Sequence, residues 1–340
     1  MVPPIVKRGF LLLLLTLLVL APFFPHVVYP IFLMKMMCFA LFACAFNLLL
    51  GHAGIVSFGH AAFFGGSAYI TGYGLREMGL STELAILAGM LFSTILGAAF
   101  GALAIRRQGI YLAMITLALA QMVYFTFLQM PFTGAEDGMQ PIPRGRLFGL
   151  IDLSSDTRLY FLVLACVIGG LWLVNRIVNS PFGEVLRAIR EHEPRARSMG
   201  YAVERYKIIA FALSAGLSGL AGSLKCVTFR LASLTDVHWH TSGDVILMTL
   251  LGGMSSVFGP AIGAVLISSL HHYFDALGAW VTVVIGIIFM LCVLVFRRGV
   301  LGEINQLLSR RSQAQRGQGQ RLGSRPPVKP IVKEHTNAQI

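Results

Sequence analysis

Long apolar runs with almost no charge determine which folds are open to this chain. Residues 84–105 and 110–130, for example, contain no acidic and no basic side chain. An α-helix needs about 20 such residues to cross the apolar core of a bilayer. Because 56% of the 340 residues are hydrophobic and only 12% are charged, a soluble core could not bury so much apolar surface. The sequence predicts an all-α fold, a polytopic bundle of transmembrane helices.

The apolar runs predict about eight to ten membrane segments. The run 244–274 is long for one crossing and is interrupted by Gly252-Gly253 and Gly259-Pro260, so we expect either two short helices or a re-entrant pair. The run 10–25 lacks a cleavage signal of the A-x-A kind, and we interpret it as a retained first span. The expected spans are 10–25, 31–50, 61–79, 84–105, 110–130, 159–178, 208–228 and 279–296.

Basic residues predict the orientation of these spans. Lys7-Arg8, Arg106-Arg107, segment 176–207 and Arg297-Arg298 all face the cytoplasm if the N-terminus is inside and 244–274 starts and ends on one side. The acidic loop 131–158 then lies outside. Both termini are therefore expected in the cytoplasm.

Two domains follow from the composition of the chain. Residues 1–298 are expected to form the transmembrane domain, with a cytoplasmic loop at 179–207. Residues 299–340 are rich in Gln, Gly, Arg, Ser and Pro, so they cannot bury enough apolar surface to order themselves. We expect a disordered basic cytoplasmic tail.

Several classes of function are disfavoured. The net charge of +12 could suggest nucleic-acid binding, but the cations lie beside apolar spans and in the tail, without an aromatic-basic platform. The five cysteines lack Cys-x-x-Cys spacing, so we expect packing residues and no metal site. No paired carboxylates or activated serine converge within the spans, so no enzyme and no cofactor in this chain are expected.

The densest internal charge lies in the loop 179–207. Ser180-Pro181 is typical of a helix start, Pro194 can open a second short helix, and Gly200 supplies a stop. In the first helix, apolar residues form one strip and charged residues point elsewhere. The segment is either a solvated loop that obeys the positive-inside rule or a handle that another protein grips, and the helix signals favour the handle. The predicted docking residues are Pro181, Gly183, Leu186, Arg187, Ile189, Arg190, Glu191, Pro194, Arg197 and Gly200.

Glycine is concentrated at 51–66, between the second and third spans. So many small residues allow close helix packing, as expected for Gly97/Gly101 and Gly259/Gly263, or unwinding beside a cavity, where transporters expose backbone groups. Both interpretations stay open. Residues 49–61 are weakly echoed at 250–261, as in transporters with repeated halves. The candidate residues of a translocation path are Asn47, Gly51, His52, Gly54, Ser57, Gly59, His60, Gly252 and Gly253.

Five motifs, in order along the chain from the second span to Arg298, together resemble the LivM-type permease subunits of bacterial ABC importers for branched-chain amino acids. Two positions depart from the family pattern: Ala135 follows Thr133-Gly134 where a second glycine is usual, and Ser255 replaces another glycine. The motifs are Gly51-x-Ala53-Gly54-x-x-Ser57-x-Gly59-His60-Ala61-x-Phe63, Arg107-Gln108-Gly109-Ile110-Tyr111-Leu112-Ala113, Thr133-Gly134 with Gly138, Ser180-Pro181-Phe182-Gly183 through Arg195-Ala196, and Gly252-Gly253 with Gly259-Pro260.

The resemblance implies a set of partners in the bacterial inner membrane. Segment 180–200 would be the coupling helix inserted into an ATPase groove, and ATP and Mg²⁺ would bind two partner ATPase subunits, because the sequence has no G-x-x-x-x-G-K-[ST] loop. A homologous second permease subunit and a periplasmic or lipid-anchored substrate-binding protein would complete the importer.

The implied function is inward transport of branched-chain aliphatic amino acids by alternating access. Urea, short amides and aromatic amino acids remain open as cargo within the same family. The alternative class is an ion-coupled secondary transporter, which would be expected to bury acidic residues in the middle of its spans.

Overall fold

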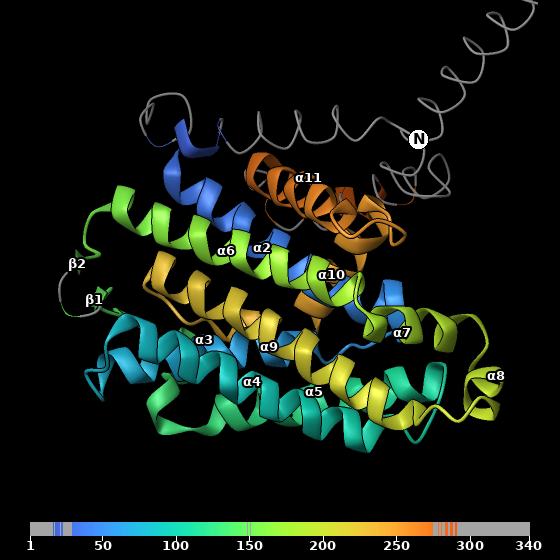
Figure 1. Cartoon of the computed structure of the whole chain (residues 1–340). Helices are drawn as coiled ribbons and strands as arrows, with labels where there is room; N and C mark the ends of the chain where they lie inside the picture. The colour runs from blue at the N-terminus through green and yellow to red at the C-terminus, as the bar shows by residue number, and fades with distance from the viewer. Residues whose placement is uncertain are drawn as a thin grey trace, which may run out of the picture.

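The computed structural model describes residues 29–147, 149 and 151–274, with isolated positions inside 16–22 and 278–290. Apart from those positions, the predicted spans 10–25 and 279–296 and the tail 299–340 lie outside the described residues. Figure 1 shows the arrangement of the helices. The longer helices are α2 (Pro30–Asn47), α3 (His60–Arg76), α4 (Thr82–Ala104), α5 (Ile110–Gln129), α6 (Asp156–Val178), α9 (Val203–Phe229), α10 (Trp239–Gly252) and α11 (Gly259–Phe274).

Shorter elements connect these helices. A π-helical turn, η2 (Leu48–Ala53), continues α2, and two short helices follow α6, namely α7 (Pro181–Glu191) and α8 (Glu193–Ser198). The strands β1 (Arg146–Leu147) and β2 (Ile151–Asp152) pair antiparallel. Three single 3₁₀ turns are η3 (Pro131–Thr133), η4 (Ala135–Asp137) and η5 (Leu234–Asp236).

The predicted all-α transmembrane bundle is confirmed for the described residues. Five helical stretches are long and apolar enough to cross a membrane. Each coincides with a predicted span to within a few residues, because runs of about 20 uncharged apolar residues leave little freedom in where a crossing begins. The five are Pro30–Ala53, Thr82–Ala104, Ile110–Gln129, Asp156–Val178 and Val203–Phe229.

The bundle has two distinct ends (Figure 1). We call them the α7 end, where α7 and α8 lie, and the β1–β2 end, where the two strands lie. Helices α2, α4 and α6 run toward the α7 end, whereas α3, α5 and α9 run away from it.

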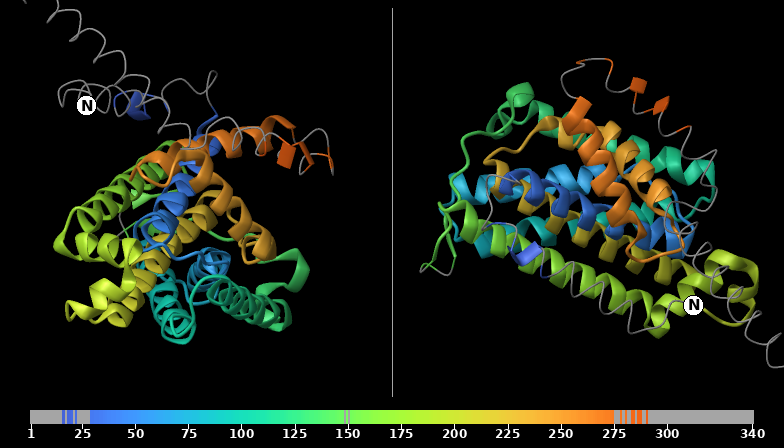
Figure 2. Two further views of the ribbon diagram at one scale, coloured as in Figure 1. Left: turned by 90° about the vertical axis from the view of Figure 1, so that its right-hand side faces the viewer. Right: turned by 90° about the horizontal axis from the view of Figure 1, so that it is seen from above.

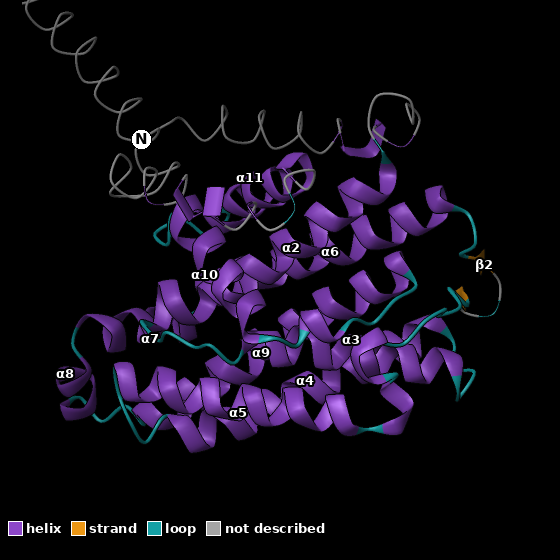
Figure 3. Cartoon of the chain, turned by 180° about the vertical axis from the view of Figure 1, so that it is seen from behind, coloured by secondary structure: helices purple, strands orange, loops and turns teal. Residues whose placement is uncertain are grey.

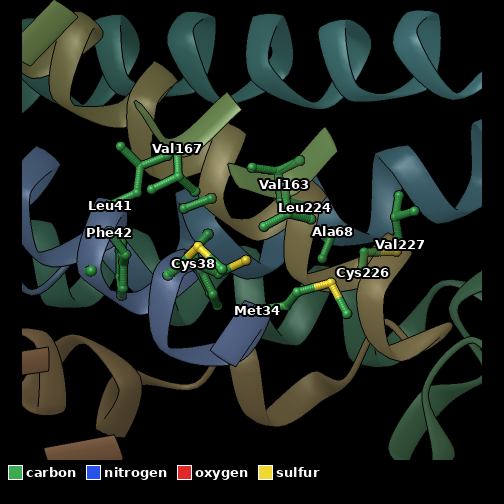
Figure 4. Close-up of a cluster of buried hydrophobic side chains, with 14 of the residues drawn as sticks. Met34, Cys38, Leu41, Phe42, Ala68, Val163, Val167, Leu224, Cys226 and Val227 are labelled. Atoms are coloured by element: carbon green, nitrogen blue, oxygen red, sulfur yellow. The ribbon is translucent and has the colours of Figure 1, made fainter. Parts of the chain in front are cut away.

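Helices α2 and α9 form the centre of the bundle, and α2 lies near its middle when the bundle is seen end-on (Figure 2). The largest apolar cluster joins α2, α3, α6 and α9 through fully buried side chains, some of which are shown in Figure 4. The predicted packing role of Gly97 is confirmed, because an added Cβ would lie 2.2 Å from the Cβ of Ala215 on α9. Small residues at such seams let helix backbones approach closely.

The run 244–274 forms two short helices, α10 and α11, which pack against each other. The ring of His238, at the start of α10, lies 5.2 Å from that of Tyr124 near the end of α5. The ring of His272, at the end of α11, lies 4.4 Å from that of Phe32 at the start of α2. The hairpin therefore starts and ends toward the β1–β2 end, and its turn at 253–258 points toward the α7 end.

Two long connections close the β1–β2 end. Met139 and Ala232 exchange backbone hydrogen bonds of 2.9 and 3.1 Å, which ties the loop after α5 to the loop after α9. Arg144 is 8% exposed and donates to the carboxylate of Asp156 at 2.5 Å and to the carbonyl of Thr228 at 3.4 Å. The acidic loop 131–158 is therefore held against the ends of α6 and α9.

Candidate coupling site and cavity

The charged loop folds into two short helices at the positions that its sequence predicted. Ser180 has the extended backbone of a residue that precedes a helix, and Pro181 occupies the first turn of α7. Pro194 lies in the first turn of α8, and Gly200 has φ +89°, a left-handed conformation that glycine adopts without strain. The segment is thus helical and not irregular.

Helix α7 is attached to the bundle by its apolar face. Leu186 and Ile189 are buried, and Leu186 belongs to a cluster with Leu49 and Ala53 of η2. Burying a leucine side chain contributes about 1.5–3 kcal/mol. A Cβ at Gly183 would lie 2.2 Å from the carbonyl oxygen of Val178, so α7 also packs closely on the end of α6.

The predicted docking residues divide into two groups. Gly183, Leu186 and Ile189 are buried against the rest of the chain. Arg187 is half-buried, and its guanidinium donates to the carboxylate of Glu184 at 3.1 Å. Arg190 is exposed as well, but its guanidinium donates to the backbone carbonyl of Gly51. The exposed members that remain available to a partner protein are Pro181, Glu191, Pro194, Arg197 and Gly200.

The last five residues of the predicted loop 179–207, including Lys207, belong to helix α9. Helix α9 begins at Val203, five residues before the predicted start of its span. The ammonium of Lys207 donates to the Glu193 carboxylate at 2.7 Å, and the lysine side chain is only 7% exposed. Because this charge is paired, it does not end the apolar helix, and a long lysine stem packs readily along apolar surface.

The glycine-rich segment both packs and unwinds. Helix α2 widens into η2, which ends at Gly54 with φ +71°, and the backbone then runs back into the bundle without helical structure (Figure 3). Helix α3 begins at His60, which is fully buried and whose Nε2 lies 2.9 Å from the Ser214 hydroxyl oxygen. Ser214 is eleven residues into α9, about 16 Å along its axis. Helix α3 therefore starts inside the bundle.

Polar side chains form hydrogen bonds with the backbone groups of residues 58–61, where the helical structure is interrupted. The amide of Ala61 donates to the Ser242 hydroxyl at 2.8 Å, and that hydroxyl donates to the carbonyl of Phe58 at 2.8 Å. The amide of Phe58 donates to Thr116 at 3.1 Å. Backbone groups left unpaired in an apolar interior cost several kcal/mol, so these hydroxyls make the break in the helix possible.

A cavity of about 590 Å³ lies at the α7 end, beside this unwound segment. Most of its lining residues are apolar or glycine, and Arg190, Glu193 and Lys207 supply charged groups. Of the nine predicted path residues, Gly54 lines it and the other eight do not. The lining comprises Ala53, Gly54, Ile55, Val56, Phe58, Gln108, Gly109, Ile110, Leu112, Ala113, Ile189, Arg190, Glu193 and Lys207.

The other predicted path residues lie in packed contacts. The amide of Asn47 donates to the carbonyl of Ser256 at 3.1 Å, and the Nδ1 of His52 lies 3.2 Å from the carbonyl oxygen of Asn47. The Gly51, Ser57, Gly59, Gly252 and Gly253 positions are buried as well. A Cβ at Gly252 would lie 2.1 Å from the carbonyl oxygen of Gly259, so the second glycine cluster shapes the α10–α11 turn.

The sequence interpretation missed a buried ion pair. Lys225 on α9 donates to the carboxylate of Asp236, and their side chains are 16% and 8% exposed. The ammonium also lies 5.7 Å from the ring centroids of Phe39 and Phe64. A lysine inside the apolar run 208–228 was the signal that could have indicated it. In the described ranges, no group of three His, Cys, Asp or Glu side chains is placed to hold a metal ion.

Comparison with known proteins identifies the family. Residues 29–294 match the family described as branched-chain amino acid transport system / permease component. The chain is 29% identical over 255 residues to the high-affinity branched-chain amino acid transport system permease protein LivM of Salmonella typhimurium, and 28% identical to LivM of Escherichia coli. Each alignment covers 68% of this chain and 60% of the relative, so the chain spans about three-fifths of the length of these relatives.

A more distant relative has a different cargo in its name. The ribose import permease protein RbsC of Bacillus subtilis is 31% identical over 198 residues, which cover 53% of this chain and 58% of RbsC. No solved structure matches the chain. The matched family consists of permeases and not of enzymes. The apolar helices and the relatives together indicate a multi-pass protein of the bacterial inner membrane. The chain therefore belongs to the permease-component family of branched-chain amino acid transport systems, and it is a permease of the LivM type.

Proposed function

We propose that this chain is a membrane subunit of an ATP-driven importer that moves branched-chain aliphatic amino acids into the cell. Its family and the names of its LivM relatives support this cargo. Uptake would proceed by alternating access, with ATP and Mg²⁺ bound on two partner ATPase subunits. A homologous second permease subunit and a periplasmic or lipid-anchored binding protein would complete the complex.

The observation that carries the proposal is the geometry of α7 and α8. The apolar face of α7 is buried on the bundle, while its opposite side exposes Glu184 and Glu191, and α8 exposes Arg197. A short helix held in this way, at one end of a membrane bundle, suits insertion into a groove of a soluble partner. We therefore assign the α7 end to the cytoplasm and the acidic loop 131–158 to the outside, in agreement with the positive-inside rule.

The cavity at the α7 end supports an exit route for cargo. Its lining combines apolar side chains such as Ile55, Leu112 and Ile189 with charged side chains, as a zwitterion with an aliphatic side chain would require. The exposed face of α5, which carries Ile110 and Met114 beside the cavity, suits a second permease subunit. The route would then run between the two permease subunits.

Uptake into proteoliposomes tests this function. The full chain is reconstituted with the second permease, ATPase and binding-protein subunits of its importer and is supplied with labelled leucine, isoleucine or valine. ATP-dependent accumulation that unlabelled branched-chain amino acids compete away is the expected result. Ribose, urea, short amides and aromatic amino acids serve as competing cargo, and preference for any of them would replace the proposed substrate.

Two further arms test the class of transporter and its orientation. Uptake by the chain without ATPase subunits, driven by a sodium or proton gradient, would show an ion-coupled secondary transporter instead. Single cysteines at Glu191 and Asp152 are labelled with a membrane-impermeant thiol reagent in intact and opened spheroplasts. The proposed orientation requires the Asp152 position to react in intact cells and the Glu191 position to react only after opening.

A further inference from the structure

The π-helical turn η2 lies between α7 and the α10–α11 turn. On one side, α7 packs on η2 through Leu186, which is fully buried among Leu49 and Ala53. On the other side, the backbone of Gly51 lies so close to the α10–α11 turn that an added Cβ would be 2.6 Å from the carbonyl oxygen of Met254. Single π-helical turns interrupt the regular hydrogen bonding of a helix and are frequent at functional positions.

Arg190 links α7 to η2. Its guanidinium donates to the carbonyl of Gly51, a contact between residues 139 positions apart. Its aliphatic stem lies over Gly54, where an added Cβ would be 2.9 Å from the Cγ of Arg190. Carbonyl groups in the last turn of a helix lack partners within that helix, and they carry the negative end of the helix dipole. A guanidinium is well suited to satisfy such a carbonyl and to neutralise it.

Asn47, the residue before η2, links η2 to the α10–α11 turn. Its amide donates at 3.1 Å to the carbonyl of Ser256, inside the α10–α11 turn. Its carbonyl oxygen lies 3.2 Å from the Nδ1 of His52, which connects the two ends of η2. A continuous chain of hydrogen bonds and close backbone contacts thus leads from α7 through η2 to the α10–α11 turn.

We propose that η2 transmits movement of α7 to the α10–α11 hairpin, and that Arg190 is the positioning residue that joins the two. This inference rests on the proposed function, because an ATPase partner is what would move α7. It assigns Arg190 a role different from that of Arg187: Arg187 pairs with Glu184 on its own helix, whereas Arg190 spans to η2. Loss of Arg190 would leave the partner bound and hydrolysing ATP, with less transport per ATP.

The test compares Arg190→Ala with Arg187→Ala in the reconstituted complex. Copurified ATPase subunits, ATP hydrolysis and uptake of labelled leucine are measured for both variants. A fluorophore attached at Ser255→Cys, an exposed position in the α10–α11 turn, reports on the hairpin when a nonhydrolysable nucleotide is added. All variants are made in a chain whose native cysteines have been replaced. Arg190→Lys restores a cation at position 190 and tests whether the function is rescued.

Arg190→Ala is expected to retain ATPase subunits and hydrolysis, to lose about tenfold in leucine moved per ATP, and to lose the nucleotide response of the fluorophore. Arg190→Lys should recover part of the transport per ATP and part of the nucleotide response. The complex that forms with Arg187→Ala should keep the nucleotide response of the fluorophore. Equal loss of ATPase subunits in the two alanine variants would overturn the inference, as would unchanged transport per ATP in Arg190→Ala.

The wild-type complex keeps the inference open to refutation even if Arg190→Ala does not fold. A wild-type complex that transports leucine with ATP, while the fluorophore at position 255 ignores nucleotide, refutes the transmission role and leaves the proposed function standing. A wild-type complex that assembles but shows no ATP-driven uptake of any cargo refutes the proposed function instead, and the inference with it.

Discussion

Replacement of Lys225 by methionine removes one partner of the buried ion pair on α9. The two side chains are 16% and 8% exposed, and the lysine ammonium also faces the rings of Phe39 and Phe64. Methionine matches the length and volume of the lysine stem but leaves the Asp236 carboxylate without its cation. The dominant cost is therefore an unpaired carboxylate in a largely buried region.

The magnitude follows from the burial of the pair. Loss of one partner of a buried ion pair costs about 3–5 kcal/mol. The two cation–π contacts, at 5.7 Å each, are worth about 0.5–1 kcal/mol apiece and are counted as part of that cost. Replacing both partners removes the unpaired charge, so Lys225→Met with Asp236→Asn should lie within about 1 kcal/mol of wild type.

Thermal unfolding in detergent micelles measures these differences. For a chain of 340 residues, a loss of about 4 kcal/mol lowers the midpoint by about 6 °C. The double variant should recover most of that shift. Arg146→Met serves as the control, because this basic residue is exposed on β1 and its loss should change stability by no more than about 0.5 kcal/mol. A single Lys225→Met variant as stable as this control would refute the argument from burial.

Three further substitutions, one of them with a matched control, test the packing of the described helices and loops. Gly222→Ala should destabilise the fold by about 1–3 kcal/mol, because the new Cβ would lie 1.9 Å from a backbone oxygen of α3. Gly169→Ala on α6 is the control, because its Cβ would meet nothing within 4 Å. In the same melting assay, this control should be as stable as the wild type or more stable. Arg144→Ala should cost about 1.5–3 kcal/mol by releasing the carboxylate of Asp156, and protease should then cut the loop 131–158 faster in right-side-out vesicles. Gly54→Ala should strain a backbone with φ +71° by about 1–2 kcal/mol, and an unchanged melting point would contradict this.

Most of the helices could be predicted from the sequence because their determinants are local. A run such as 84–105 has no charge to place, so its crossing is set by length alone, and the observed helix ends one residue earlier. Helices α7 and α8 were predictable for the same reason, since Pro181, Pro194 and Gly200 act on their own backbone. The assignment of buried and exposed faces on α7 followed from its apolar strip.

The contacts of the candidate site could not be predicted, because they join residues far apart in the chain. Asn47 and Ser256 are 209 positions apart, and nothing in either neighbourhood indicates the other. The start of α3 inside the bundle depends on hydroxyl groups from Thr116 and Ser242. Arg187 and Arg190 looked equivalent as surface cations, and only tertiary packing separates a pair within one helix from a contact with η2.

The backbone bridge between Met139 and Ala232 has a consequence for how the protein is made. A ribosome must deliver the chain through residue 232 before the loop after α5 has its partner, although α5 itself ends at Gln129. In the proposed orientation, this face of the nascent protein is open to periplasmic chaperones and proteases while the intervening residues are synthesised. Arrested chains that end before α9 should therefore be degraded from that side, whereas chains that extend past α10 should survive.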